Sequence, residues 1–204
     1  MKNVVTLIAA CLVTSLAFAN NAELIVQRID NGSAIAGDTY RVYVKVSEPG
    51  NSVHAIFGDD YSSMSINCTS SFYQHEYGGH TTLDVNQAIL QMAPTLAYDS
   101  WVTIGAVSSL NNNLWEVGID FESFDTGSSL TVEDGAWFLL PTDVQSLASS
   151  NNLVLIAQLT TEGVASGTIN VQGWDANQEA WQERGLTFST SNAHVFGCMN
   201  SDAT

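Results

Sequence analysis

The chain has 204 residues, in which 21 acidic residues face only 5 strongly basic ones, and its formal net charge is −16. Such an acidic surface repels phosphate backbones and anionic lipid headgroups, so neither nucleic acid nor an anionic membrane surface is expected as a partner. Beyond the first twenty residues, no stretch reaches the roughly 18 apolar residues that a membrane-spanning helix needs.

The N-terminus has the layout of an export signal. Met1–Asn3 is a short basic start, Val4–Leu16 is an apolar core, and Ala17–Ala19 is a small-x-small cleavage site. The pattern predicts a signal peptide over residues 1–19 and an exported mature chain, either extracellular or periplasmic. An alternative is a lipid-anchored start at Cys11, after Ile8-Ala9-Ala10. The apolar run that continues past Cys11 argues against it, because a lipid-attached start is normally followed by a polar linker.

Most of the mature chain has the pattern of β-strands. Thr39–Val46 is the clearest, because Tyr40, Val42, Val44 and Val46 alternate with polar residues and share one face. The other expected strands are Glu23–Ile29, Val53–Phe57, Met64–Cys68, Ser100–Val107, Leu114–Phe121, Ser129–Val132, Ala136–Leu140 and Leu186–Ser189. Turn residues separate them at the spacing of a β-sandwich or jelly roll.

One segment, about residues 84–93, has helical periodicity. Apolar residues fall at i, i+3, i+4 and i+7, namely Val85, Ala88, Ile89 and Met92. Asp84 is the expected N-cap, and Pro94 prevents the helix from continuing. A second short helical turn is expected from Thr142 to Ala148.

The stretch Leu153–Gln172 is the expected centre of the fold. Leu153–Leu159 is apolar on both faces, which is typical of a strand buried in a core, and Thr168–Gln172 alternates as a strand with one wetted face does. We interpret the two as a β-hairpin that presents the loop Gly173–Arg184.

These elements predict an all-β fold, a single β-sandwich or jelly roll with one short helix, over residues 20–190. Two cysteines remain after export, Cys68 and Cys198, and an even pair in an exported chain favours a disulfide. That bond would tether the polar tail, residues 191–204, to the middle of the chain.

Several strings resemble an uncharacterised family of secreted modules from aquatic microbes, over about Ile35–Ser189. They are Thr39–Val44, Tyr98–Gly105, Val154–Thr160 and Ser166–Gln172. The lead-in Ala36-Gly37-Asp38-Thr39 is also similar to the opening strand of cohesin-like sandwiches. The resemblance implies a secreted β-sandwich, and it assigns no functional residue.

Calcium is the candidate cofactor. Asp175, Asn177 and Glu179 place oxygen ligands at positions 1, 3 and 5 of a loop, as hard-cation loops do. The loop is not an EF-hand, because Ala180 replaces the turn glycine and Leu186 replaces the bidentate glutamate. An acidic surface turn is the simpler interpretation.

Exposed aromatic side chains are the candidate ligand contacts. Trp174 and Trp181 lie among polar residues and Tyr77 lies in a glycine-containing loop, whereas Trp101 and Trp137 lie in apolar strands and are expected in the core. For the two loop tryptophans, a side chain folded back onto the core is the simpler interpretation. His75 and His80 flank Tyr77, but their spacing of five does not match the i, i+4 pair of a zinc helix, which leaves a loop site with a distant third ligand as the zinc alternative.

Signatures of catalysis are sparse. Gly118–Glu122 resembles the strand of jelly-roll glycoside hydrolases that attack laminarin-like glucans, with Asp120 and Glu122 at alternate positions, but Gly118 stands where the nucleophile belongs. The sequence therefore favours a secreted, non-catalytic binding or structural module of the cell surface or extracellular matrix, with carbohydrate or an extracellular protein as ligand. The alternatives are a glycan-active hydrolase and a self-assembling envelope subunit that adds its N-terminal strand to a neighbour.

Overall fold

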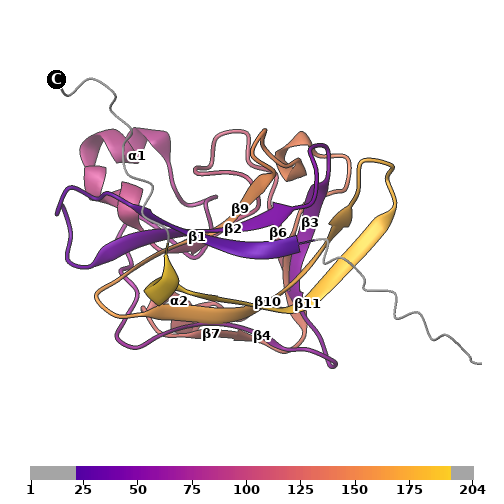
Figure 1. Cartoon of the computed structure of the whole chain (residues 1–204). Helices are drawn as coiled ribbons and strands as arrows, with labels where there is room; N and C mark the ends of the chain where they lie inside the picture. Colours follow the sequence, from indigo (N-terminus) through magenta and orange to yellow (C-terminus); the bar gives the residue numbers. More distant parts are fainter. Residues whose placement is uncertain (1–21, 194–204) are drawn as a thin grey trace, which may run out of the picture.

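The computed structural model describes residues 22–193, which form two antiparallel sheets packed face to face. Sheet A contains, in spatial order, β1 (Ala22–Ile29), β2 (Asp38–Val46), β9 (Leu153–Thr161) and β5 (Trp101–Val102). Sheet B contains β6 (Trp115–Val117), β8 (Gly135–Phe138), β3 (Ser52–Gly58), β10 (Ala165–Trp174), β4 (Met64–Cys68) and β7 (Leu130–Val132), with β11 (Ala180–Ser189) paired to β10. The predicted β-sandwich is confirmed, and Figure 1 shows the two layers.

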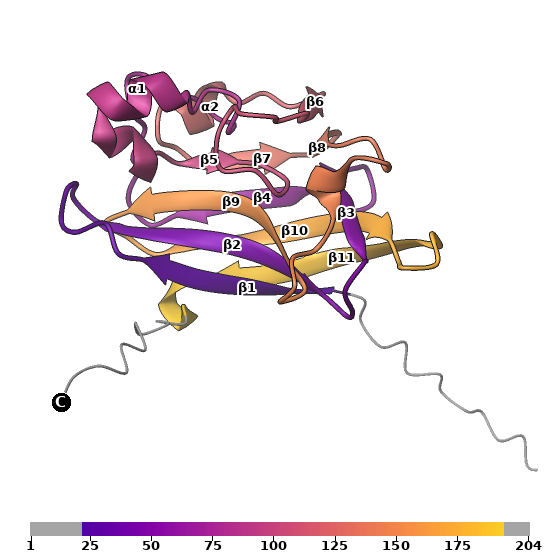
Figure 2. The same ribbon diagram turned by 90° about the horizontal axis from the view of Figure 1, so that it is seen from above.

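The helical elements are short. They are α1 (Gln87–Met92), α2 (Glu122–Asp125) and the 3-10 turns η1 (Pro94–Tyr98), η2 (Val144–Ser146) and η3 (Thr190–Asn192). Seen from above, β1, β2 and β9 run side by side and α1 lies beyond β9 (Figure 2). No helix among residues 22–193 combines the length and apolar character needed to cross a membrane.

The main core lies between the sheets. Val42, Val44 and Val46 of β2 are fully or almost fully buried, as the alternation of that strand predicts. The same cluster contains Ile56 and Trp137 of sheet B. Trp101 and Trp137 are both buried, so their predicted core positions are confirmed, and the Trp137 indole donates to the Thr103 carbonyl at 3.0 Å.

β9 is buried on both faces, as its apolar run predicts. Val154 and Ile156 belong to the core between the sheets. Leu155 packs instead with Val85, Leu96 and Trp101 in a second cluster formed with the α1–η1 segment.

The predicted β9–β10 hairpin is wrong. β9 pairs with β2 and β5 in sheet A, while β10 pairs with β3, β4 and β11 in sheet B, so the short link between them crosses from one sheet to the other. The link packs along the end of β4, where the amide of Val164 donates to the Thr69 hydroxyl and the amide of Thr69 donates to the Val164 carbonyl. Val164 therefore bonds to the residue that follows β4, and the link does not close a hairpin.

The predicted helix is present but shorter, and Asn86 caps it in place of Asp84 by accepting from the Ala88 amide at 2.8 Å. Its predicted buried face is right in part: Val85 and Ile89 pack in the second cluster, together with the unpredicted Leu90. Ala88 and Met92 are exposed instead, Met92 to 86%. Strands predicted over 100–107 and 114–121 shrink to β5 and β6. The helix α2 was not predicted.

Asn170 of β10 is a fully buried amide that joins three strands. Its Nδ2 donates to the carbonyls of Phe57 and Ser62, and its Oδ1 accepts from the Ser62 hydroxyl and the Gly185 amide. The side chain thereby holds the turn that separates β3 from β4 and the bulge that offsets β11 from β10.

Cutting this amide back should destabilise the whole sandwich. Asn170→Ala leaves several buried polar groups without partners, so we expect the free energy of unfolding to fall by about 3 kcal/mol or more. Urea unfolding measures it. The exposed Asn151→Ala is the control and should stay within about 0.5 kcal/mol of the wild type. A loss below about 1 kcal/mol for Asn170→Ala would contradict the role assigned to it.

The predicted disulfide involves Cys198, which lies outside the described residues, as do the predicted signal peptide and Cys11. Cys68 has no disulfide partner among residues 22–193. It pairs with Ala165 across β4 and β10, and the Ala165 amide donates to the hydroxyl of Thr190, three residues before the described chain ends. Cys198 follows the last described residue, Ala193, by five residues, and its bond to Cys68 stays a prediction.

Thiol labelling of the denatured protein, purified after secretion by an expression host, tests this bond. Without reductant we expect no reactive thiol, and with reductant two. Reduction should also lower the melting temperature, because the bond closes a long loop whose constraint is worth at most about 5 kcal/mol. Two thiols reacting without reductant would exclude the disulfide.

Candidate ligand-binding site

The outer face of sheet B carries a concave pocket of about 630 Å³, a volume typical of ligand sites. Strands β3, β8, β10 and β11 supply most of its wall. The lining residues are His54, Ala55, Ala136, Phe138, Leu139, Leu140, Pro141, Gln172, Gly173, Trp174, Ala180, Trp181 and Gln182. Both tryptophans that the sequence singled out therefore lie at the same pocket.

Trp174 is held in place by β3. The His54 ring meets the Trp174 ring edge-on, with centroids 5.1 Å apart and planes at 81°. Nε2 of His54 lies 2.8 Å from the Ser52 hydroxyl, which contacts the Trp174 carbonyl at 3.3 Å. Burial lowers the pKa of His54, so the ring is neutral at pH 7. The Trp174 indole is half-buried, and the neutral His54 ring fixes its orientation.

Trp181 does not lie in a loop as predicted. It belongs to β11 opposite Gly173 and is 8% exposed. The indole fills the space beside Gly173, where an added Cβ would lie 2.7 Å from Trp181 Cζ2. Its Nε1 has no hydrogen-bond partner among the described residues. Although Trp181 contacts the pocket, its indole packs in the main core between the sheets, where this donor is buried.

The pocket lining is uncharged. None of its described residues is an aspartate, glutamate, lysine or arginine, although the chain carries 21 acids. Its exposed polar groups are the amides of Gln172 and Gln182, which both donate and accept hydrogen bonds. The site can therefore offer aromatic surface and amide hydrogen bonds, without an ionic contact.

Tyr77 is 52% exposed but does not line this pocket. Its loop, residues 75–80, folds over the buried carboxylate of Asp99, which accepts from the amides of His75 at 2.7 Å and Gly79 at 3.3 Å. Gly78 permits the close approach, because an added Cβ would lie 1.8 Å from Asp99 Oδ2. The glycines of this motif therefore serve packing around a carboxylate.

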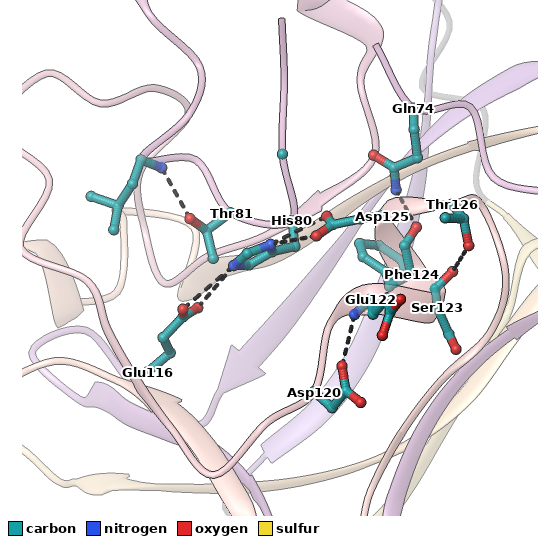
Figure 3. A network of polar contacts seen from close by, with 12 residues as sticks. Gln74, His80, Thr81, Glu116, Asp120, Glu122, Ser123, Phe124, Asp125 and Thr126 are labelled. Carbon is teal, nitrogen blue, oxygen red and sulfur yellow. Dashed lines mark hydrogen bonds and ion pairs between the residues drawn. The ribbon is translucent and has the colours of Figure 1, made fainter. Parts of the chain in front are cut away.

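The two histidines of the same loop face different partners. His75 Nε2 lies 3.2 Å from the Thr95 hydroxyl, and its Nδ1 accepts from the Tyr77 amide. His80 lies between two carboxylates, with Nδ1 3.0 Å from Asp125 and Nε2 3.2 Å from Glu116 (Figure 3).

The ring of His80 also stacks on Phe121, with centroids 4.2 Å apart. Only a protonated imidazole donates from both nitrogens, so both contacts become charged hydrogen bonds when the ring carries its second proton. The arrangement ties the loop to β6 and α2. Within residues 22–193, no three His, Cys, Asp or Glu side chains are grouped in a way that could hold a metal ion.

The predicted calcium loop forms the tight turn between β10 and β11. Asp175 Oδ1 accepts from the amides of Asn177 and Glu179, each at 2.8 Å. One of its carboxylate oxygens thus caps the turn, which is the simpler interpretation given to this loop. Calcium at Asp175, Asn177 and Glu179 stays a prediction.

Asp120 and Glu122 do not share a strand as predicted. β6 ends at Val117, and Asp120 Oδ1 accepts from the amide of Glu122, which is the first residue of α2 (Figure 3). The alternation that suggested two carboxylates on one face of a sheet is therefore a turn followed by a helix.

The structure adds Trp115, to which the sequence assigned no role. It is 61% exposed on the edge strand β6. The run Trp115-Glu116-Val117 gives no local signal of this exposure, because its alternation is that of a strand with one buried face, whereas all three residues are exposed. His54, which the sequence left without a partner, is the support of Trp174.

Comparison with known proteins yields little. No family model matches the chain, and no curated protein matches it. Among solved structures, the collagen-binding domain from a Staphylococcus aureus adhesin aligns with 84% of this chain and 95% of its own, at 8% identity and a TM-score of 0.28. Nothing about the ligand of this chain is taken from that similarity.

The Asp99 carboxyl should make stability depend on pH. Burial raises the pKa of Asp99 from 3.8 to about 7, and this effect outweighs the backbone hydrogen bonds to the carboxylate, which lower the pKa. Between those values the folded chain holds a proton that the unfolded chain has released. The free energy of unfolding therefore falls as the pH rises, by at most about 1.4 kcal/mol per pH unit from this group.

Asp99→Asn removes this titration. Urea unfolding between pH 4.5 and 6.5 should show a smaller loss of stability with rising pH in the variant than in the wild type. Asp60→Asn, in an exposed turn, should keep the wild-type slope. Equal slopes for Asp99→Asn and wild type would show that Asp99 does not carry the effect.

Proposed function

We propose that the chain is a secreted, non-catalytic binding module of the cell surface or extracellular matrix, and that its ligand is a neutral carbohydrate. The observation that carries the proposal is the uncharged pocket of the outer face of sheet B, with Trp174 at its wall and Gln172 and Gln182 beside it.

Charge separates the possible ligand classes. An anionic polysaccharide would meet a chain with a formal net charge of −16 and would find no lysine or arginine in the pocket. A cationic ligand would find no carboxylate there. A neutral ligand is not repelled by the net charge and needs no charged partner in the pocket, so a neutral molecule fits best.

The lining also matches the two kinds of surface on a sugar ring. The C–H face of a pyranose is apolar and suits an indole, while its hydroxyls need donors and acceptors at the edge. Trp174 is oriented before any ligand arrives, through His54 and Ser52, so binding orders few side chains.

An extracellular protein that inserts an apolar side chain into the pocket is the second candidate, supported by the apolar residues Phe138 and Leu140 in the lining. The envelope-subunit alternative needs a free N-terminal strand. Residues 22–29 are instead paired with β2 along their whole length.

Binding to polysaccharides tests the proposal. The purified chain should bind at least one of laminarin, cellulose, xylan and mannan, and should not bind the anionic alginate. Trp174→Ala should weaken that binding by roughly tenfold or more, because it removes the stacking surface. Depletion assays and isothermal titration calorimetry measure both effects.

Tyr61→Ala is the matched aromatic control. Tyr61 is 91% exposed and does not line the pocket, so this variant should bind as the wild type does. Melting curves establish that all three proteins are folded. Absence of binding to every neutral polysaccharide, or unchanged binding by Trp174→Ala, would reject the carbohydrate site.

A further inference from the structure

The pocket is part of a longer row of side chains that crosses sheet B from edge to edge. Trp115 of β6 pairs with Phe138 of β8, Phe138 pairs with Ala55 of β3, Ala55 with Gln172 of β10, and Gln172 with Gln182 of β11. Residues paired across antiparallel strands point to the same face, so these five form one continuous row.

The row lies on the outer face. Trp137, next to Phe138 in β8, points to the opposite face and is fully buried in the core between the sheets. Trp115 and Gln172 are exposed. The acid beside Trp115 does not enter the row, because Glu116 pairs with Trp137 and its carboxylate contacts His80.

The charged residue next to the row, Arg184, is paired with an aspartate. In the next row toward β4, the Arg184 guanidinium lies 4.8 Å from the ring centroid of Phe57. It forms hydrogen bonds of 2.7 and 2.6 Å to the two carboxylate oxygens of Asp59. The row itself, Trp115 to Gln182, contains aromatic, aliphatic and amide side chains and no charged one.

The row is longer than a single sugar. Four inter-strand spacings of about 4.8 Å give roughly 19 Å, the length of several linked pyranose rings. The pocket reaches from Phe138 to Gln182 but does not include Trp115. Trp115 therefore provides a second aromatic surface at a distance from Trp174.

We propose that the ligand is a linear neutral polysaccharide that lies across the strands, with one ring on Trp174 near the amides of Gln172 and Gln182 and a more distant ring on Trp115. This inference rests on the proposed function, and it specifies the length and direction of the ligand. Trp174 serves any ligand that fills the pocket, whereas Trp115 serves only a chain long enough to reach β6.

Calorimetry with oligosaccharides of increasing length tests the inference. The probes are the disaccharides to hexasaccharides of the laminari-, cello-, xylo- and manno- series. The affinity of the wild type should rise by roughly tenfold from the shortest to the longest member of the bound series, because a second stacking contact is added. Trp115→Ala should lose that rise and keep the disaccharide affinity, while Trp174→Ala should bind every length more weakly.

The outcomes separate the two proposals. If Trp115→Ala binds every length as the wild type does, the extended row is rejected while the carbohydrate pocket stands. If no oligosaccharide binds the folded wild type, both are rejected. A second copy of the chain could occupy the row instead, and sedimentation velocity tests this. If the wild type is a dimer and Trp115→Ala is a monomer, the row serves self-association and the inference is overturned. Tyr61→Ala again controls for loss of an exposed aromatic.

Discussion

The arrangement of sheet B depends on the hydrogen bonds made by the buried side-chain amide of Asn170. β10 pairs with β4 along its first half and with β3 along its second half, while β11 follows its other side. Asn170 lies where these pairings change, and it bonds to the turn after β3 and to the bulge of β11. Since one-residue shifts move side chains to the opposite face, this junction keeps Gln172 and Trp174 on the outer face. The pocket thus depends on a buried polar group that does not line it and stands two residues before Gln172 in β10.

The sequence predicted which segments are strands wherever the pattern of apolar residues is regular. The alternation of β2 and the continuous apolar run of β9 predicted both strands, because one is wetted on one face and the other is covered on both. Strand partners were not readable. The short link between β9 and β10 resembles a hairpin loop, yet Val164 bonds to Thr69, nearly a hundred residues earlier in the chain. Such a long-range bond leaves no local pattern.

In the candidate site too, local patterns could be predicted from the sequence and long-range contacts could not. Trp174 was recognised because it stands among polar residues, but its support, His54, belongs to a strand whose residues are all buried and lacks any nearby sequence cue. Trp115 was missed because a tryptophan in a strand is usually a core residue. Its exposure follows from the position of β6 at the edge of the sheet, which only the pairing order reveals. Asp120 and Glu122 were misplaced because an aspartate that caps a turn has the same two-residue spacing as a strand.

The uncharged lining of the pocket has a consequence for the surroundings in which the chain can work. Dissolved ions screen attraction between opposite charges over about 10 Å at 0.1 M, so ionic recognition weakens as salinity rises. A contact made of indole, aliphatic and amide groups contains no such attraction to lose. The numerous carboxylates elsewhere keep the molecules apart in dilute water, while salt only lowers their mutual repulsion. Binding of the proposed neutral ligand through this face would therefore persist from fresh water to brine.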